Sequence, residues 1–481
     1  MTDQQALNRA SLPLIGAIRW DAWFPGNTYP GFVDPLLYTA YDFRKPFYGW
    51  FNSGIPEHAE IMDQEIDYAS EAKLDFWAFV WYPENDEHPG IAQINGCLND
   101  YMSSAKHHLM QFCLVLQTGW VAGKHLGSWR ELFVPEFVEK MRDPQYVKVE
   151  GNRPLLFWMD TEFLDSVDKG FGCNWREELD YLTEQLLNAG MGKPFLVDMR
   201  HDYASALRFG LDGISDYGPA SIKLKGHHAY AALAAHDREK LESSHGLQIV
   251  PGIGAAIDPR PRDLGEWTLQ TGIQYGFSFE LPTHDEWLEH LKSTCEWVQQ
   301  NEKKAGSPGI VCIYSWNEID EGGPGIVPTE QEGTYFLDAI YEVKTGKTRA
   351  DQWNRVNDSN PMIVYKGEWE SIFPHKGCYC NDITSSDAIG SSFSYTFNGT
   401  ELRLIGGKGP DYGMLEVEID SGKVRMEVDL YNIDAQPSIV LCSIGGLPAG
   451  KHILKAMLLK KHNWNSLGHK ATLDAVHFRT E

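Results

Sequence analysis

The segment VCIYSWNEIDEGGPG, residues 311–325, joins an apolar run to a group of carboxylates. Its first four residues are apolar, and Glu318, Asp320 and Glu321 follow shortly after. A carboxylate that is buried without a partner costs several kcal/mol, and three close together also repel one another. The segment therefore predicts a buried strand that opens at its carboxyl end into a polar site.

Seven further apolar runs of strand length precede this one, and helical patterns lie between several of them. Strands that are apolar along their whole length are typical of a parallel sheet covered on both faces. Eight such strands alternating with helices predict an α/β fold, a (β/α)8 TIM barrel; an open doubly wound sheet is the alternative. The expected strands are 14–19, 74–82, 112–117, 154–160, 194–198, 211–216, 247–252 and 309–316, and the helical patterns are 57–73, 176–190 and 284–299.

The pattern changes after the last helical stretch. A polar segment without apolar period follows, and then short alternating runs separated by Gly, Pro and Asn, which are typical of an all-β sandwich. We therefore expect a catalytic barrel at 1–345, a linker at 346–360, and at 361–481 an all-β sandwich domain that binds carbohydrate or has a structural role.

The net charge of -25, from 42 basic and 67 acidic residues, argues against nucleic acid and anionic membranes as partners. No apolar run approaches the roughly 18 residues of a membrane-spanning helix. The N-terminus shows no signal peptide, so we expect a cytoplasmic protein, or a secreted or periplasmic one if a leader had been removed. The eight cysteines lack zinc-site spacing, so we expect neither a metal nor another cofactor.

Acidic, amide and aromatic residues follow most of the expected strands. The active site of a (β/α)8 barrel lies at the carboxyl ends of its strands. A cup of carboxylates and aromatic rings suits a neutral polyhydroxyl ligand, which indicates a carbohydrate substrate. The candidate substrate-binding residues are Trp20, Asp21, Trp23, Trp81, Tyr82, Gln117, Trp120, Asp160, Asp198, Arg200, His201, Asp216, Tyr217, Arg260, Trp316 and Asn317.

Glu318 and Glu321 are the candidate catalytic residues. Glycoside cleavage uses two carboxyl groups, one that protonates the leaving oxygen and one that acts as base or nucleophile. Repulsion between two neighbouring carboxylates keeps one of them protonated near neutral pH, as a general acid must be. The competing interpretation is that both side chains lie on a solvated loop.

The segment SWNEIDEGG, 315–323, resembles the Asn-Glu-x-x-Glu-Gly motif of glycoside hydrolase family 99, the endo-α-mannosidases and their relatives. The segments 45–52, 60–82, 146–160 and 250–262 are similar to other parts of that family. The resemblance implies a (β/α)8 glycosidase that retains anomeric configuration without a metal. By motif position, Glu318 is the base that deprotonates the substrate's own 2-hydroxyl, and Glu321 is the acid/base.

The segment GGKGPDYGMLEVEIDSG, 406–422, is similar to β-sandwich modules appended to enzymes of polysaccharide degradation. The first hypothesis is therefore a hydrolase that cleaves an α-linked glycan. Two alternatives stay open: an inverting hydrolase that pairs Glu321 with a carboxylate from another strand, and a non-catalytic carbohydrate-binding or glycan-biosynthesis protein. A carboxyl separation of about 5 Å is typical of retention and about 6.5–9.5 Å of inversion.

Overall fold

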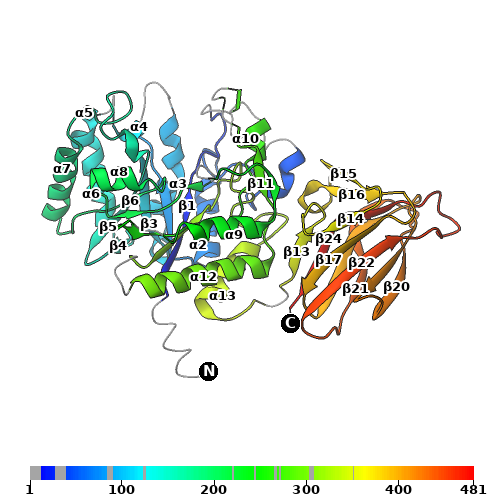
Figure 1. The fold of residues 1–481 in the computed structure, drawn as a ribbon. Helices are drawn as coiled ribbons and strands as arrows, with labels where there is room; N and C mark the ends of the chain where they lie inside the picture. The colour runs from blue at the N-terminus through cyan, green and yellow to red at the C-terminus, as the bar shows by residue number, and fades with distance from the viewer. Residues whose placement is uncertain are drawn as a thin grey trace.

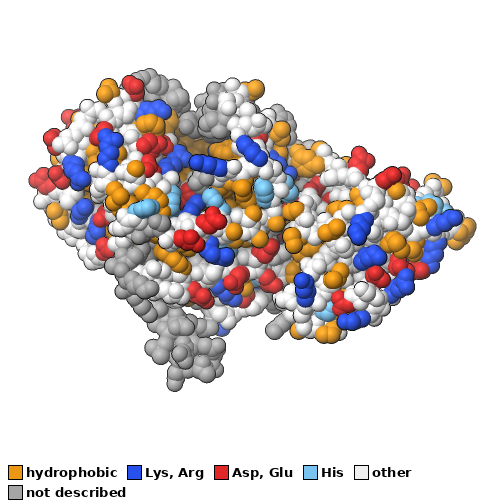
Figure 2. Space-filling model, in the orientation of Figure 1, with side chains coloured by type: hydrophobic (Ala, Val, Ile, Leu, Met, Phe, Trp, Pro, Cys, Tyr) orange, Lys and Arg blue, Asp and Glu red, His pale blue; other side chains and the backbone are white. Residues whose placement is uncertain are grey.

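The computed structural model describes residues 12–27, 39–83, 90–122, 126–218, 222–242, 245–264, 268–269, 272, 274–302, 308–349 and 352–480. These residues form two parts that lie side by side, a parallel sheet with helices and a group of antiparallel sheets (Figure 1). On the face shown in Figure 2, acidic and basic side chains are interspersed over both parts. No helix among the described residues is long and apolar enough to cross a membrane.

The first part is built on a curled sheet in which every neighbouring pair on the main path is parallel. Its order is β10-β12-β1-β2-β3-β5-β6-β7-β9, and β4 pairs with β5 at the side. A strand overlaps each of the eight expected runs, and the run 247–252 contains β9 and the first residue of β10. The strands are β1 (Leu14–Arg19), β2 (Phe76–Val80), β3 (Gln111–Gln117), β4 (Lys148–Val149), β5 (Arg153–Met159), β6 (Phe195–Asp198), β7 (Gly213–Ile214), β9 (Gln248–Ile249), β10 (Gly252–Gly254) and β12 (Ile310–Tyr314).

The two end strands of this sheet, β9 and β10, are separated in the chain by Val250 and Pro251. Val250 donates its N–H to Ile214 of β7 at 2.9 Å, and the Pro251 carbonyl accepts from Cys312 of β12 at 2.9 Å. Proline has no N–H to give to a ladder. The sheet is therefore barrel-like, as expected, but its ladder is interrupted at this step and does not close.

Helices cover the outside of the sheet (Figure 1). The three helical patterns correspond to α2 (His58–Glu71), α7 (Trp175–Asn188) and α12 (His284–Glu302). In α2, Ile61, Met62, Ile66 and Ala69 are buried, and the last three belong to the main core. The other elements of this part are η2 (Thr39–Arg44), η3 (Ile91–Asn95), α3 (Gly96–Ser103), η4 (His107–Leu109), α4 (Thr118–Val121), α5 (Leu126–Ser128), η6 (Trp129–Phe133), α6 (Val134–Arg142), η7 (Thr161–Phe163), α8 (Tyr203–Phe209), β8 (Gly226–His228), α9 (Tyr230–Glu239), α10 (Arg260–Leu264), β11 (Phe277–Phe279) and α13 (Tyr335–Thr345).

The C-terminal part consists of three antiparallel sheets, β13-β24-β18-β21, β14-β17-β22-β19-β20 and β15-β16-β23. Side chains in β22 alternate between exposed and buried. Leu402, Leu415 and Leu454, from both larger sheets, share one core. The elements are β13 (Asn354–Asn357), β14 (Val364–Lys366), β15 (Glu370–Ile372), η9 (Tyr379–Asn381), β16 (Ile383–Ser386), β17 (Ser392–Asn398), β18 (Glu401–Lys408), β19 (Met414–Ile419), β20 (Val424–Asp429), β21 (Gln436–Ile444), β22 (Lys451–Leu458), β23 (Ala471–Leu473) and β24 (Ala475–Arg479).

The strand β13 lies inside the segment 346–360 that the sequence predicts as a linker. It pairs with β24 from Asn354 opposite Phe478 to Asn357 opposite Ala475. Val356 is 1% exposed and belongs to the core of the C-terminal part. Residues 354–357 are therefore part of the β domain. The sequence did not predict this strand, because four residues are too few to show an alternating pattern.

The two parts meet through η2 and η9. Tyr41 and Phe43 of η2 form a buried cluster with Cys380 of η9. Ile319, from the loop that carries the candidate catalytic glutamates, belongs to the same cluster. The β domain therefore packs against elements that border the candidate site.

An ion pair between Arg355 of β13 and Glu332 crosses this boundary at 2.7 Å, with side chains 29% and 3% exposed. Replacing Arg355 by Met leaves the Glu332 carboxylate without its cation, so we expect a loss of about 3 kcal/mol of unfolding free energy, at the lower end for breaking a buried pair. Urea denaturation measures the loss. Arg425→Met, which breaks an exposed pair with Glu416, is the control; we expect little change there, and an equal loss in both variants would contradict the account.

Candidate active site

The loop after β12 buries its carboxylates. Glu318, Asp320 and Glu321 are 2%, 0% and 4% exposed, so the interpretation of a solvated loop is wrong. The chain turns back sharply, and the N–H of Gly322 donates to the carbonyl of Glu318 at 2.6 Å. Gly325 has φ +67, and a Cβ there would lie 2.5 Å from a backbone oxygen. The glycines after Glu321 thus allow a compact loop that folds over its own acids.

Glu318 and Glu321 are both hydrogen-bonded to Tyr314, the last residue of β12. The Tyr314 hydroxyl lies 3.0 Å from Oε2 of Glu318 and also contacts Oε1 of Glu321. Tyr217, which follows β7, donates to Oε1 of Glu318. Tyr275 donates to Oε2 of Glu321 at 3.0 Å. Three tyrosines therefore surround two carboxyls inside a buried space.

The guanidinium of Arg262 forms ion pairs with two of these acids, Asp320 and Glu321. Arg262 in α10 donates from Nε to Asp320 at 2.6 Å and from Nη1 to Glu321. Its guanidinium also lies 5.7 Å from the ring centroid of Trp20. The Glu318 carboxyl is hydrogen-bonded to the hydroxyls of Tyr217 and Tyr314. The charge of Arg262 is therefore directed at Asp320 and Glu321.

Burial and the neighbouring Glu321 raise the pKa of Glu318 well above its usual value, and Arg262 and Tyr217 offset only part of this rise. Burial also raises the pKa of Asp320, against the opposing effect of Arg262. Glu318 is hydrogen-bonded to Tyr217 and Tyr314, and its raised pKa favours its protonated form. The site thus combines Glu318, whose burial favours the neutral form, with Glu321, which pairs with Arg262.

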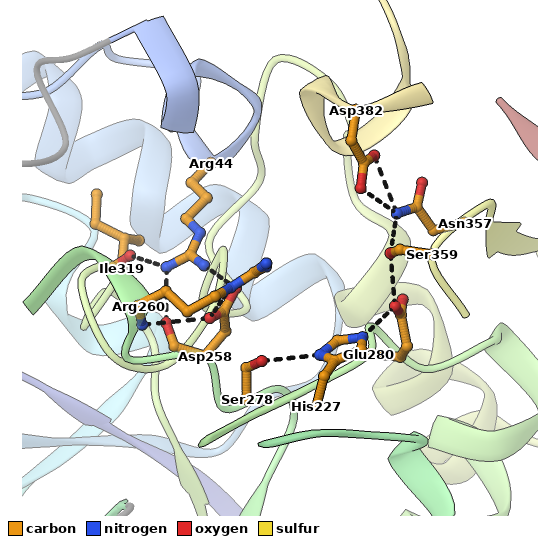
Figure 3. Close-up of polar contacts among 10 residues, drawn as sticks. All are labelled: Arg44, His227, Asp258, Arg260, Ser278, Glu280, Ile319, Asn357, Ser359 and Asp382. Atoms are coloured by element: carbon orange, nitrogen blue, oxygen red, sulfur yellow. Dashed lines mark hydrogen bonds and ion pairs between the residues drawn. The ribbon is translucent and has the colours of Figure 1, made fainter. Parts of the chain in front are cut away.

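Two further arginines, Arg44 and Arg260, bind Asp258, and Arg44 also contacts the loop after β12 at Ile319 (Figure 3). Arg44 donates from Nη1 to the carbonyls of Asp258 and Ile319, at 3.0 and 3.1 Å. Arg260 donates to both oxygens of Asp258, at 2.7 and 2.6 Å. Burial alone would raise the pKa of Asp258, but Arg260 and Arg44 hold it below its usual range. Because the Asp258 N–H also donates to the Glu321 carbonyl at 2.8 Å, this cluster fixes the backbone at Glu321.

The predicted residues Gln117, Asp160 and Arg200 form a partly buried group at the ends of β3, β5 and β6. Asp160 accepts from Gln117 Nε2 at 2.6 Å and from Arg200 at 2.9 and 3.1 Å. Tyr82 and Trp120 lie edge to face, with ring centroids 5.3 Å apart.

Several other predicted residues make internal bonds instead. Asn317 donates to Asp21 at 2.7 Å, and its backbone carbonyl accepts from the Trp23 indole at 2.7 Å. Trp316 donates to Glu65 at 2.7 Å, and Trp81 donates to Glu136 of α6 at 3.0 Å. The described contacts give these side chains packing roles, tying β1, β2 and the loop after β12 together.

The predicted residues on the loops after β6 and β7 also have internal partners. Asp198 is fully buried and accepts from Thr161 Oγ1 at 2.5 Å; burial raises its pKa. His201 lies 2.9 Å from the Tyr203 hydroxyl, and burial lowers the pKa of His201 to about 4. Asp216 forms an ion pair with Lys240. These groups shape the loops that carry Arg200 and Tyr217.

The sequence did not predict Tyr314 and Tyr275 as site residues, and it did not predict the contact between Arg262 and Glu321. Tyr314 had one signal, a hydroxyl at the end of an apolar strand four residues before Glu318. Tyr275 had none, because it lies on an irregular segment far from Glu321 in the chain. Among the described residues, no group of three or more His, Cys, Asp and Glu side chains is arranged to hold a metal ion.

No family model matches the chain. An A type blood N-acetyl-α-D-galactosamine deacetylase from Flavonifractor plautii is 31% identical over 100 residues, 21% of this chain and 13% of that protein. A protein described as glycoside hydrolase-like has a TM-score of 0.42 at 12% identity, over 69% of this chain and 94% of its own. An exo-β-1,3-galactanase from Phanerochaete chrysosporium has a TM-score of 0.21 at 15% identity, over 28% and 31%. The chain is thus similar in part to proteins named for work on carbohydrates, and these likenesses assign no family.

The raised pKa of Glu318 makes the free energy of unfolding depend on pH. Its folded pKa lies above the ordinary 4.5, so the stability that the proton contributes is complete below pH 4.5 and is lost as pH rises through the folded pKa. Glu318→Gln has no proton to lose. We expect this variant to become progressively more stable than the wild type as pH rises above 4.5, measured by thermal unfolding at a series of pH values.

Glu321→Gln is the matched variant, because it removes a carboxylate that pairs with Arg262. We expect it to lose about 3 kcal/mol near pH 7, since it removes one of the two carboxylates that form ion pairs with this buried guanidinium. A constant difference between Glu318→Gln and the wild type at all pH values, or equal losses in the two variants, would contradict the assignment of the proton to Glu318.

Proposed function

We propose that the chain is a glycoside hydrolase that cleaves an α-linked glycan, retaining configuration through the substrate's 2-hydroxyl, with Glu318 as base and Glu321 as acid/base. The observation that carries the proposal is the pair of buried glutamates that shares one tyrosine hydroxyl. Such a pair supplies one carboxyl with a proton and one without, as glycoside cleavage requires. The motif resemblance to family 99 and the names of the partial relatives are in keeping with it.

The spacing of the pair argues against inversion by these two carboxyls. Two carboxyls that contact one hydroxyl have their nearest oxygens within two hydrogen-bond lengths, about 5.5 Å at most. Inverting enzymes need about 6.5–9.5 Å between the carboxyls to hold the attacking water, whereas the spacing rule for retaining enzymes assumes a carboxylate nucleophile and does not apply when the 2-hydroxyl attacks. We further propose that the barrel-like sheet acts as a (β/α)8 catalytic scaffold, with the partly buried group of Gln117, Asp160 and Arg200 binding sugar hydroxyls beside the glutamates.

The test is product release from α-linked mannans, glucans and polymers that contain rhamnose or uronate. Wild type and Glu321→Gln are compared, with Glu330→Gln as the control because Glu330 forms an exposed pair with Lys45. We expect one polymer to be cleaved by wild type and control, and Glu321→Gln to be slower by about 10²–10⁴-fold, the usual contribution of a general acid or base.

Equal rates in Glu321→Gln and wild type would remove Glu321 from the reaction. Binding of a polymer without cleavage by the wild type would favour a carbohydrate-binding protein. The anomer of the first product, followed by NMR, separates retention from inversion: an inverted product would contradict participation of the 2-hydroxyl.

A further inference from the structure

We propose that Tyr314 relays a proton between Glu318 and Glu321, and this inference rests on the proposed function of the pair. Its hydroxyl is hydrogen-bonded to both catalytic carboxyls. The relay sets which of the two glutamates is the acid. Neither the motif nor the resemblance gives Tyr314 a role.

The hydrogen bonds of the two carboxyls require more protons than the neighbouring donors supply. Tyr217 donates to Oε1 of Glu318, and Arg262 and Tyr275 both donate to Oε2 of Glu321. The two remaining oxygens, Oε2 of Glu318 and Oε1 of Glu321, both contact the Tyr314 hydroxyl. A phenol has one proton to donate. Both contacts are hydrogen bonds only when one carboxyl is itself protonated and donates to the Tyr314 oxygen.

The position of Arg262 decides which carboxyl donates in the empty site. Glu321 pairs with the guanidinium, whose charge favours a carboxylate there, whereas Glu318 is bonded to tyrosine hydroxyls, so the proposal places the proton on Glu318. The chain of bonds therefore runs from Glu318 Oε2–H to the Tyr314 oxygen, and from the Tyr314 O–H to Glu321 Oε1. Burial, together with both glutamates, raises the pKa of Tyr314, so a free tyrosinate is unfavourable and the two transfers must be concerted.

The transfer balances without any other reactant. The Glu318 Oε2–H bond breaks as the proton joins the Tyr314 oxygen, while the Tyr314 proton joins Glu321 Oε1. Glu318 becomes a carboxylate and Glu321 becomes a carboxylic acid, the state in which Glu318 acts as base and Glu321 as acid. The pair holds two hydrogen bonds to Tyr314 before and after, with their directions reversed. Its total charge does not change.

The surroundings hold the Tyr314 hydroxyl in place. Tyr314 is 2% exposed, and its ring packs edge to face on Tyr217 with centroids 5.4 Å apart. Gly218 adopts φ +62, and a Cβ there would lie 2.6 Å from the ring carbon that bears the hydroxyl. Only a glycine at this position leaves room for that ring. The close approach fixes the relay atom between the two carboxyls.

The relay predicts opposite shifts for two tyrosines that contact the same glutamate. In Tyr314→Phe the singly protonated pair loses two hydrogen bonds and the fully ionised pair loses one, so we expect the higher of the two pKa values of the pair to fall by about one unit. Tyr217→Phe removes a donor that favours ionised Glu318, so we expect that pKa to rise. A tyrosine with only a donor role would raise it in both variants.

The titration is followed by NMR of protein labelled with ¹³C at the glutamate carboxyls, with the Glu318 signal identified by its loss in Glu318→Gln. Tyr275→Phe is the matched control, because Tyr275 contacts Glu321 and not Glu318; we expect the higher pKa to stay in place. An unchanged or raised value in Tyr314→Phe would overturn the relay, and so would the same fall in Tyr275→Phe. If Tyr314→Phe does not fold, Gly218→Ala displaces the hydroxyl and should give the same fall.

The titration uses no substrate, so its failure is distinct from failure of the proposed function. A fall in Tyr314→Phe with no glycan cleaved by the wild type would support the relay and overturn the glycosidase. Where a glycan is cleaved, the relay also predicts that the alkaline limb of the wild-type pH–rate profile moves to lower pH in Tyr314→Phe. An unmoved limb would overturn it.

Discussion

The site depends on one constraint: Arg262 is shared by two buried carboxylates, while a third acid lies beside them. One guanidinium cannot neutralise three charges in a space from which water is excluded, so one acid must hold a proton. The contacts select Glu318, since its hydrogen-bond partners are the hydroxyls of Tyr217 and Tyr314. The carboxylates at the strand exit are thus tolerated because their charge is reduced, and that reduction supplies an acid for chemistry.

The rest of the chain keeps this arrangement rigid. The buried contacts of Asn317 and Trp316 tie the loop to β1 and α2, and Arg44 ties Ile319 to Asp258. On the other side, a hydrogen-bonded chain from His227 through Glu280 and Ser359 reaches the β domain, with Glu280 2.5 Å from His227 and 2.7 Å from Ser359 (Figure 3). The β domain therefore supports the loops at the site as well as extending the chain.

Much of this was predictable. The eight apolar runs marked the strands because β-branched and aromatic runs of that length fit a sheet covered on both faces. Because these strands are apolar along their whole length, the sequence shows no alternation that would tell which way the side chains at the strand ends point. Trp81 and Trp316 could therefore not be distinguished from residues that face the site. Tyr314 was hidden by lying within its strand, and Tyr275 by its distance in sequence from Glu321. The interruption at Pro251 and the membership of 354–357 in the β domain depend on pairing partners that no local pattern specifies.

Neutron diffraction from a deuterated crystal tests the central claim most directly, because it locates the protons of the glutamate pair. The account predicts one deuteron on Oε2 of Glu318, directed at the Tyr314 oxygen, with the Tyr314 deuteron directed at Oε1 of Glu321. A deuteron on Glu321, or two ionised glutamates, would contradict the account.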